Sequence, residues 1–143
     1  MRLFLDANIL VAVLNKEIPV YNYAARILSL STHPRFTLYT SPIALAIAFY
    51  FAQKKCGAVM AKSKIDLLSN YIEIAESNKQ CVINTLANKR ISDFEDGLQY
   101  YAAENIGCDV IITEDTADFS FSSIEVHNSL DFLSKYLKNI QSK

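Results

Sequence analysis

The sequence predicts an α/β fold of three layers, in which a short, mostly parallel sheet is flanked by helices on both faces. Short apolar runs of strand length alternate with longer segments of helical periodicity, the order that builds a parallel sheet with helical crossovers. The length of 143 residues suits one domain, over residues 1–143, with a core that needs no disulfide. Hydrophobic side chains make up 51% of the chain and there are only 3 Gly and 3 Pro, which excludes a disordered or collagen-like chain.

Strands are expected where short apolar or β-branched runs occur, at residues 2–5, 36–39, 81–83, 110–113 and 124–126. Helices are expected where apolar residues recur at helical spacing, at residues 7–14, 21–30, 42–55, 58–77, 93–105 and 130–140. The second of these helices ends before the break at His33-Pro34.

Two of the helices have clear start signals. Ser41 and Pro42 suit the N-cap and the first helical position. The helix that they open is apolar nearly all round, so we expect it to be buried. Ser92 and Glu95 have the spacing of a capping box, and residues 105–107 supply a C-terminal stop for the helix that follows.

The formal net charge of -1 hides an uneven distribution. Residues 1–90 carry 11 Lys or Arg and 5 acids, whereas residues 91–134 carry 10 acids and no Lys or Arg. The near-neutral total argues against a protein that coats nucleic acid or an anionic membrane by bulk charge. The acidic stretch is either a solvated face or the source of a cation site.

The cysteines and the N-terminus indicate a soluble cytoplasmic protein. Cys56, Cys81 and Cys108 are an odd number with no C-x-x-C spacing, so neither a disulfide framework nor a zinc site is expected. Asp6 interrupts the N-terminal apolar run, so no signal peptide is expected. The longest apolar run, residues 43–52, is too short to cross a membrane.

Carboxylates gather at one edge of the predicted sheet, the edge where parallel strands end and where open α/β folds bind ligands. Asp6 ends the first strand, and the helix that leads into the 110–113 strand opens at the same edge. Asp109 precedes that strand and is expected at the opposite edge. The acids expected at the ligand-binding edge are Asp6, Asp93, Glu95, Asp96, Asp115 and Asp118.

Such a cluster has a chemical use. Carboxylates repel one another, and burying one is costly unless it is paired or bound to a cation. No Lys or Arg in residues 91–134 neutralises them. Hard oxygen ligands suit Mg²⁺ or Mn²⁺, which bind phosphates and lower the pKa of water. The pattern therefore points to metal-assisted phosphodiester hydrolysis.

The acids differ in how well structure alone explains them. Asp93 and Glu95 suit helix capping and the helix dipole. Asp96 lies inside the apolar stripe of its helix, where a charge needs a functional reason. Asp115 and Asp118 lie in a loop, where acids are common. The lysines at positions 54, 55, 62 and 64 are expected to form a solvated helix face.

Three segments in this order resemble PIN-domain proteins, including the toxin ribonucleases of VapBC toxin–antitoxin pairs. The segments are LDAN at residues 5–8, DFEDGLQY at residues 93–100 and IITEDTADF at residues 111–119. The resemblance covers nearly the whole chain. It implies a compact PIN-like α/β fold, dependence on Mg²⁺ or Mn²⁺, cleavage of an RNA substrate, and usually a homodimer, with an antitoxin protein as a further partner.

The resemblance also implies roles for single residues. Asp6 and Asp96 match the first and third acids of the family, and the fourth falls on Asp118 or Asp115. Asn8 and Thr113 match accessory polar positions.

One position departs from the family pattern. The second acid is normally a Glu in the helix after the second strand, and by spacing its place is taken here by Ile47. Three carboxylates, helped by Asp93, are then expected to hold one metal.

Two functions stay open. The first is a metal-dependent ribonuclease, acting alone or as the toxin of a pair. The second is a catalytically weakened or inactive PIN-like module that binds RNA or protein. A response-regulator receiver is set aside because no Lys follows the 110–113 strand. A haloacid-dehalogenase-type phosphatase is set aside because Asp6-Ala7-Asn8 lacks a second acid.

Overall fold

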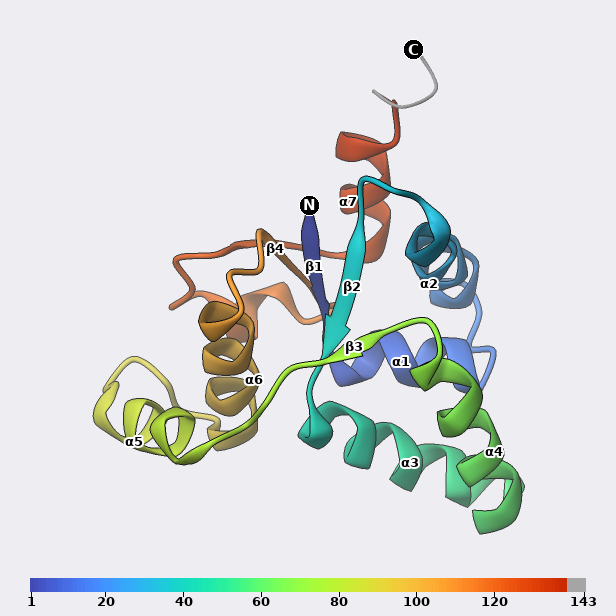
Figure 1. Ribbon diagram of the computed structural model, residues 1–143, viewed down its shortest axis with the longest axis horizontal. Helices are drawn as coiled ribbons and strands as arrows, with labels where there is room; N and C mark the ends of the chain where they lie inside the picture. Colours follow the sequence, from blue (N-terminus) through green and yellow to red (C-terminus); the bar gives the residue numbers. More distant parts are fainter. Residues whose placement is uncertain (139–143) are drawn as a thin grey trace.

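A computed structural model of the protein describes residues 1–138 and contains a five-stranded sheet at its centre (Figure 1). Its strands are β1 (Arg2–Leu5), β2 (Thr37–Thr40), β3 (Glu73–Ile74), β4 (Val110–Ile112) and β5 (Glu125–His127). They are ordered β3-β2-β1-β4-β5, and every pair is parallel. The first strand of the chain is therefore the central one, with Leu3 opposite both Leu38 and Val110.

Helices cover both faces of the sheet, as the sequence predicts. The α-helices of residues 1–138 are α1 (Ala7–Leu14), α2 (Val20–Leu28), α3 (Pro42–Cys56), α4 (Ala58–Ser69), α5 (Lys79–Ala87), α6 (Phe94–Asn105) and α7 (Ser129–Tyr136). Two short 3-10 helices are η1 (Ser29–Thr32) and η2 (Thr116–Phe119). Figure 1 shows α5 and α6 on one side of the sheet and the other α-helices on the other side. The α/β fold class is confirmed.

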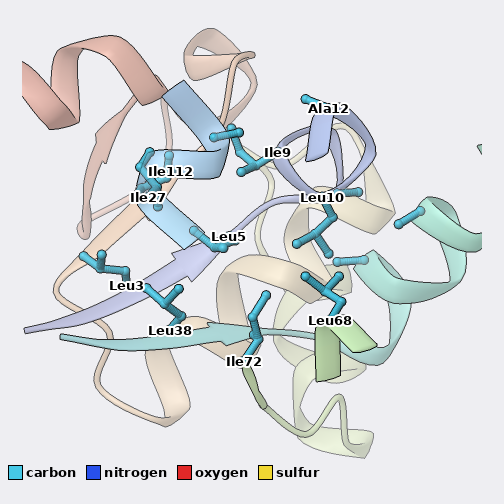
Figure 2. Packing of buried hydrophobic residues seen from close by; sticks show 14 of the residues in the cluster. Leu3, Leu5, Ile9, Leu10, Ala12, Ile27, Leu38, Leu68, Ile72 and Ile112 are labelled. Atoms are coloured by element: carbon cyan, nitrogen blue, oxygen red, sulfur yellow. The ribbon is translucent and has the colours of Figure 1, made fainter. Parts of the chain in front are cut away.

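The sheet separates two apolar clusters, because side chains alternate between its faces along each strand. Leu3 and Leu5 of β1 belong to the larger cluster, which they share with residues of α1, α2, α3, α4 and α7 (Figure 2). Phe4, between them, packs on the opposite face with Tyr100 of α6 and Phe119 of η2. A central strand that is apolar on both faces is typical of a parallel sheet.

The middle of the chain departs from the prediction in two places. The helix expected over residues 58–77 ends at Ser69, and the chain then forms the short edge strand β3 beside β2. The strand expected over residues 81–83 is wrong, because this segment lies within α5. The side chain of Asn78 caps α5 by accepting a hydrogen bond from the backbone N–H of Cys81, and Cys81 and Thr85 are buried one turn apart.

The prediction that residues 42–55 form a helix is confirmed, but the prediction that this helix is buried is wrong for most of its residues. Its fully buried residues are Ala44, Ala48 and Ala52, a stripe of small side chains on the side that packs against α1 and α4. On other sides of the helix, Tyr50 and Phe51 are 52% and 44% exposed. The apolar character of α3 thus continues onto a face open to solvent.

The C-terminal end of α1 is held by two lysines from other helices. Lys64 of α4 donates to the carbonyl of Leu14 at 3.0 Å, and Lys55 of α3 donates to the carbonyl of Asn15. Cations are favourable at this end of a helix because the backbone dipole is negative there. Lys54, Lys55 and Lys62 are exposed, as expected of a solvated face, and the expectation is wrong only for Lys64, which is half-buried.

The other boundaries lie close to those expected. The segment expected as a helix over 21–30 is α2 followed by η1, and the strands expected at 36–39 and 124–126 each begin and end one residue later. Residues 139–140 of the last predicted helix lie outside the described residues, which include α7 up to Tyr136. Within residues 1–138, no helix combines the length and the apolar character needed to cross a bilayer.

Candidate active site

Asp6 is placed by the junction between β1 and α1. One of its carboxylate oxygens accepts a hydrogen bond from the backbone N–H of Ala7 at 2.7 Å, as the N-cap of α1. The other accepts one from the hydroxyl of Thr113 at 2.7 Å. Thr113 directly follows β4, the neighbour of β1 in the sheet. The ends of these adjacent parallel strands therefore meet as the sequence predicts, and they hold the Asp6 side chain nearly buried.

Asn8 ties the loop after β4 to the start of α1. Its amide nitrogen donates to the Thr113 hydroxyl at 3.1 Å and to a carboxylate oxygen of Asp115 at 3.3 Å. Its amide oxygen accepts from the backbone N–H of Glu114 at 3.2 Å. The Thr113 hydroxyl also accepts from the backbone N–H of Asp115 at 3.1 Å. The site is thus built on a connected polar network rather than on separate side chains.

Asp96 lies in the first turn of α6, which begins one residue later than the predicted capping box requires. The N-cap is Asp93, whose carboxylate accepts from the backbone N–H of Asp96 at 3.0 Å. The capping role predicted for Ser92 is wrong, because Asp93 satisfies the helix end instead. Gly97 sets how closely α5 approaches this turn, since a Cβ there would lie 2.3 Å from a methyl carbon of Thr85.

One cleft of about 530 Å³ brings several predicted site residues together. Those that line it are Asp6, Asn8, Asp96 and Asp115. Further acids on its wall are Glu17, Glu95 and Glu114. Ile47 lines it as well, so the position at which the resemblance places a second acid does face the carboxylates.

Three predicted site residues lie outside the lining. Thr113 is buried behind Asp6, whereas Asp93 and Asp118 are exposed side chains near Asp96, close enough for their charges to raise its pKa. Asp109, excluded by sequence, lies at the opposite edge, where its carboxylate accepts from the backbone N–H of Arg2 at 2.7 Å.

The cleft favours protonated carboxyls as long as no cation is bound. Burial raises the pKa of Asp96 to about 7, and the neighbouring charges of Asp93 and Asp6 add to the rise. Burial also raises the pKa of Asp6, although the hydrogen bonds from Thr113 and Ala7 oppose it. Among the described residues neither carboxylate forms an ion pair.

The donor set suits a divalent cation, although it is not a preformed cage. Within residues 1–138, no three carboxylate, imidazole or thiol side chains lie close enough together to form a ready metal cluster. Carboxylates repel one another unless a cation lies between them, so a spread arrangement is expected of them. Their oxygens are the ligands that Mg²⁺ and Mn²⁺ prefer, and no Lys or Arg pairs with Asp6 or Asp96 in the described chain.

Gln99 is a site residue that sequence reasoning missed. It is only 2% exposed, it lines the cleft, and a hydrogen bond from its side chain lowers the pKa of Asp6. Its amide oxygen is buried without a hydrogen-bond partner. The signal in the sequence was a polar residue within the apolar stripe of the helix, three residues after Asp96.

Comparison with known proteins identifies the family of the chain. The family model described as PIN domain matches residues 2–117, most of the chain. The chain belongs to the PIN-domain family. Ribonuclease VapC1 of Aquifex aeolicus (strain VF5) is 27% identical over 139 residues, which cover 94% of this chain and 95% of that relative.

Solved structures of VapBC proteins share the fold. A structure of VapBC-1 from nontypeable Haemophilus influenzae matches with a TM-score of 0.71 at 20% identity, covering 91% of this chain and 99% of that chain. A structure of VapBC2 from Rickettsia felis, bound to a DNA fragment from their promoter, matches with a TM-score of 0.69 at 22% identity, covering 90% and 98%. This PIN domain therefore has the same arrangement of sheet and helices as these two structures, although their sequences are only 20–22% identical to it.

Proposed function

We propose that this PIN domain is a metal-dependent ribonuclease that hydrolyses RNA phosphodiesters. The observation that carries the proposal is the meeting of Asp6, after β1, and Asp96, in α6, on one cleft without a countercharge. Such oxygen ligands suit Mg²⁺ or Mn²⁺. The similarity to a ribonuclease over nearly the full length of both chains supports the same activity.

In this proposal the residues have distinct roles. The metal ligands are Asp6 and Asp96, together with Asp115 or Asp118, and the accessory residues are Asn8, Asp93 and Thr113. When bound, the cation supplies charge stabilisation at the phosphate and lowers the pKa of a water molecule. Thr113 and the N–H of Ala7 orient the two oxygens of Asp6. Hydrolysis joins the water oxygen to phosphorus and breaks one bond from phosphorus to a ribose oxygen, which leaves with a proton.

The ribonuclease proposal is tested with purified protein, labelled RNA and Mn²⁺ or Mg²⁺. The wild-type protein should cleave RNA, and EDTA should stop the cleavage. Asp6→Asn should show no more cleavage than the EDTA-treated protein. Glu76→Gln removes a carboxylate that is exposed outside the cleft and should leave cleavage unchanged. Cleavage that Asp6→Asn retains would not depend on this carboxylate and would contradict the proposal.

We also propose that the protein is a toxin that forms a homodimer and is neutralised by an antitoxin. Support comes from the fold that it shares with VapBC structures. Co-expression with the product of a small neighbouring reading frame should yield a stable complex and should restore growth to cells in which the PIN domain alone is harmful. Sedimentation of the isolated chain measures the homodimer.

A second candidate function is a weakened PIN-like module that holds RNA or a protein partner. Ile47 favours it, because an apolar side chain lines the cleft where the family resemblance places an acid. Metal titration separates the two functions. Tight uptake of Mn²⁺ with no RNA cleavage would favour the binding module, whereas uptake with cleavage would favour the ribonuclease.

A further inference from the structure

The wall of the cleft formed by α3 contributes no carboxylate. Residues 42–56 contain neither Asp nor Glu. The α3 residues that line the cleft are Ile47 and Phe51, and both are apolar. A cation held by Asp6 and Asp96 would therefore have acidic groups on one side and an apolar wall on the other.

Glu95 lies where it can compensate for this wall. Glu95 lines both the acidic cleft and a second, mostly apolar pocket between α3 and the start of α6. Ile47 also lines both. The helices that carry these two residues, α3 and α6, pack against each other. The Glu95 carboxylate is also within electrostatic range of Asp96.

The Glu95 carboxylate has no structural task in the described chain. The N-terminal end of α6 is capped by Asp93 rather than by a capping box that uses Glu95. Glu95 accepts no hydrogen bond and forms no ion pair within residues 1–138. An exposed acid in the first turn of a helix is favourable through the dipole alone, but its position on the cleft wall does not follow from that.

A second observation, independent of the acids, points to a ligand at the same place. Gln99 follows Glu95 by four residues, so both lie on one face of α6. Its side chain is 2% exposed and lines the cleft, and its amide oxygen has no hydrogen-bond donor. Buried acceptors are nearly always satisfied by protein, water or a bound group, so this oxygen marks a polar ligand at this wall.

We infer that Glu95 supplies, from α6, the carboxylate that α3 lacks at Ile47, and that it holds a divalent cation together with Asp6 and Asp96. The inference rests on the proposed function. It adds Glu95 to the proposed ligands, and it moves the second carboxylate of the site from α3 to α6. Glu17, another exposed acid on the cleft wall, lies in the loop after α1 and, unlike Asp115, is not among the groups that act most strongly on Asp6 or Asp96.

The test is calorimetric titration of the purified, EDTA-stripped protein with Mn²⁺, which needs no RNA. Glu95→Gln should weaken binding about 10- to 100-fold, the range seen when a group around a metal site is removed. Glu76→Gln, which removes an exposed carboxylate away from the cleft, should bind as the wild type does. Wild-type affinity in Glu95→Gln, with binding lost in Asp6→Asn, would overturn the inference and leave the proposed function intact.

A double variant tests whether the carboxylate of Glu95 stands in for one at position 47. Adding Ile47→Glu to Glu95→Gln should restore Mn²⁺ binding, whereas adding Ile47→Gln should not. If Ile47→Glu does not restore Mn²⁺ binding in a folded protein, the second carboxylate has not moved from α3 to α6. Weaker binding in Glu17→Gln, together with unchanged binding in Glu95→Gln, would also overturn this part of the inference. A wild-type protein that binds no Mn²⁺ would overturn the proposed function and this inference together.

Discussion

Asp96 is a carboxyl group that is both partly buried and surrounded by other acids, which is unfavourable for its charged form when no cation is bound. It is partly buried at the first turn of α6, and the charges of Asp93, Asp6, Asp118 and Glu95 all act on it. Its raised pKa means that the folded protein holds a proton that the unfolded chain releases at a much lower pH. The site is therefore a place where function and stability oppose each other.

The first prediction concerns the stability of Asp96→Asn without divalent cations. The pKa of Asp96 is about 7 in the folded protein, against an ordinary value of 3.8. As pH rises from about 4 to about 7, the unfolded chain loses this proton first, so the wild-type protein loses stability across that window. Asp96→Asn should therefore raise the free energy of unfolding at about pH 8 and leave it nearly unchanged at about pH 4.

Urea denaturation in EDTA at the two pH values measures this difference. Asp66→Asn, at an exposed site in α4, is the matched control and should show no such pH dependence. An equal effect of Asp96→Asn at both values would mean that the carboxyl group is not destabilised by ionisation.

The second prediction concerns Thr113, whose hydroxyl makes three hydrogen bonds in the site. It donates to Asp6 and accepts from Asn8 and from the N–H of Asp115. Thr113→Val keeps the shape but leaves these groups without their partner, which should lower the free energy of unfolding by about 1–3 kcal/mol. Thr113→Ser keeps the hydroxyl and should lose less. Chemical denaturation measures both, and a loss in Thr113→Ser as large as that in Thr113→Val would show that the hydroxyl contributes no more to stability than the methyl group.

At the scale of elements, α1 is fixed at both ends. Asp6 caps its N-terminus, and Lys55 and Lys64 donate to carbonyls at its C-terminus. Since Asn8 is also in this helix, the position of α1 sets the distance between several site residues and the loop after β4.

The third prediction follows from this arrangement. Lys55→Met and Lys64→Met should each lower the free energy of unfolding by about 0.3–1 kcal/mol, because each removes a cation from a helix C-terminus. Lys62→Met removes the same charge from an exposed position and should change stability less. Thermal unfolding at low and high salt is the measurement, and a Lys62 effect as large as the other two would point to net charge rather than to helix capping.

Some strands and helices could be predicted from the local sequence pattern, and others could not. Residues 2–5 and 110–112 were predictable as strands because buried parallel strands are continuous apolar runs. Residues 81–83 are too few to distinguish a strand from a helix turn, and the cap at Asn78 and the burial of Thr85 decide for α5. For α6, Ser92 and Asp93 are both good caps one residue apart, and only the packed structure selects Asp93.

The candidate site was predictable to a similar degree. Asp6, Asn8, Asp96 and Asp115 meet because parallel strands end at one edge, a rule that needs only the order of elements. The burial of Gln99 and the free position of Glu95 depend on how α6 is capped and packed against α3. The tasks of Lys55 and Lys64 depend on contacts between helices that the sequence does not show locally.

The fourth prediction belongs to the whole molecule. A cation that binds only the folded protein stabilises it, by about 2.7 kcal/mol when its concentration is 100 times the Kd. Mn²⁺ should therefore raise the Tm of the wild-type protein by several degrees, and EDTA should reverse the change. Asp6→Asn should show no rise. Calorimetry measures this, with NaCl at matched ionic strength as control, and an equal rise in NaCl would indicate screening rather than a site.

The central position of β1 has a consequence for the order in which the protein is made. The hydroxyl that holds Asp6 comes 107 residues later in the chain, after β4. A nascent chain that ends before β4 thus carries Asp6 without Thr113 or Asp115, and without the strand that pairs with β1 on this side. The site is therefore complete only after β4 and the loop that follows it have been made, so a partly made chain that lacks them has Asp6 in place without the groups that orient it.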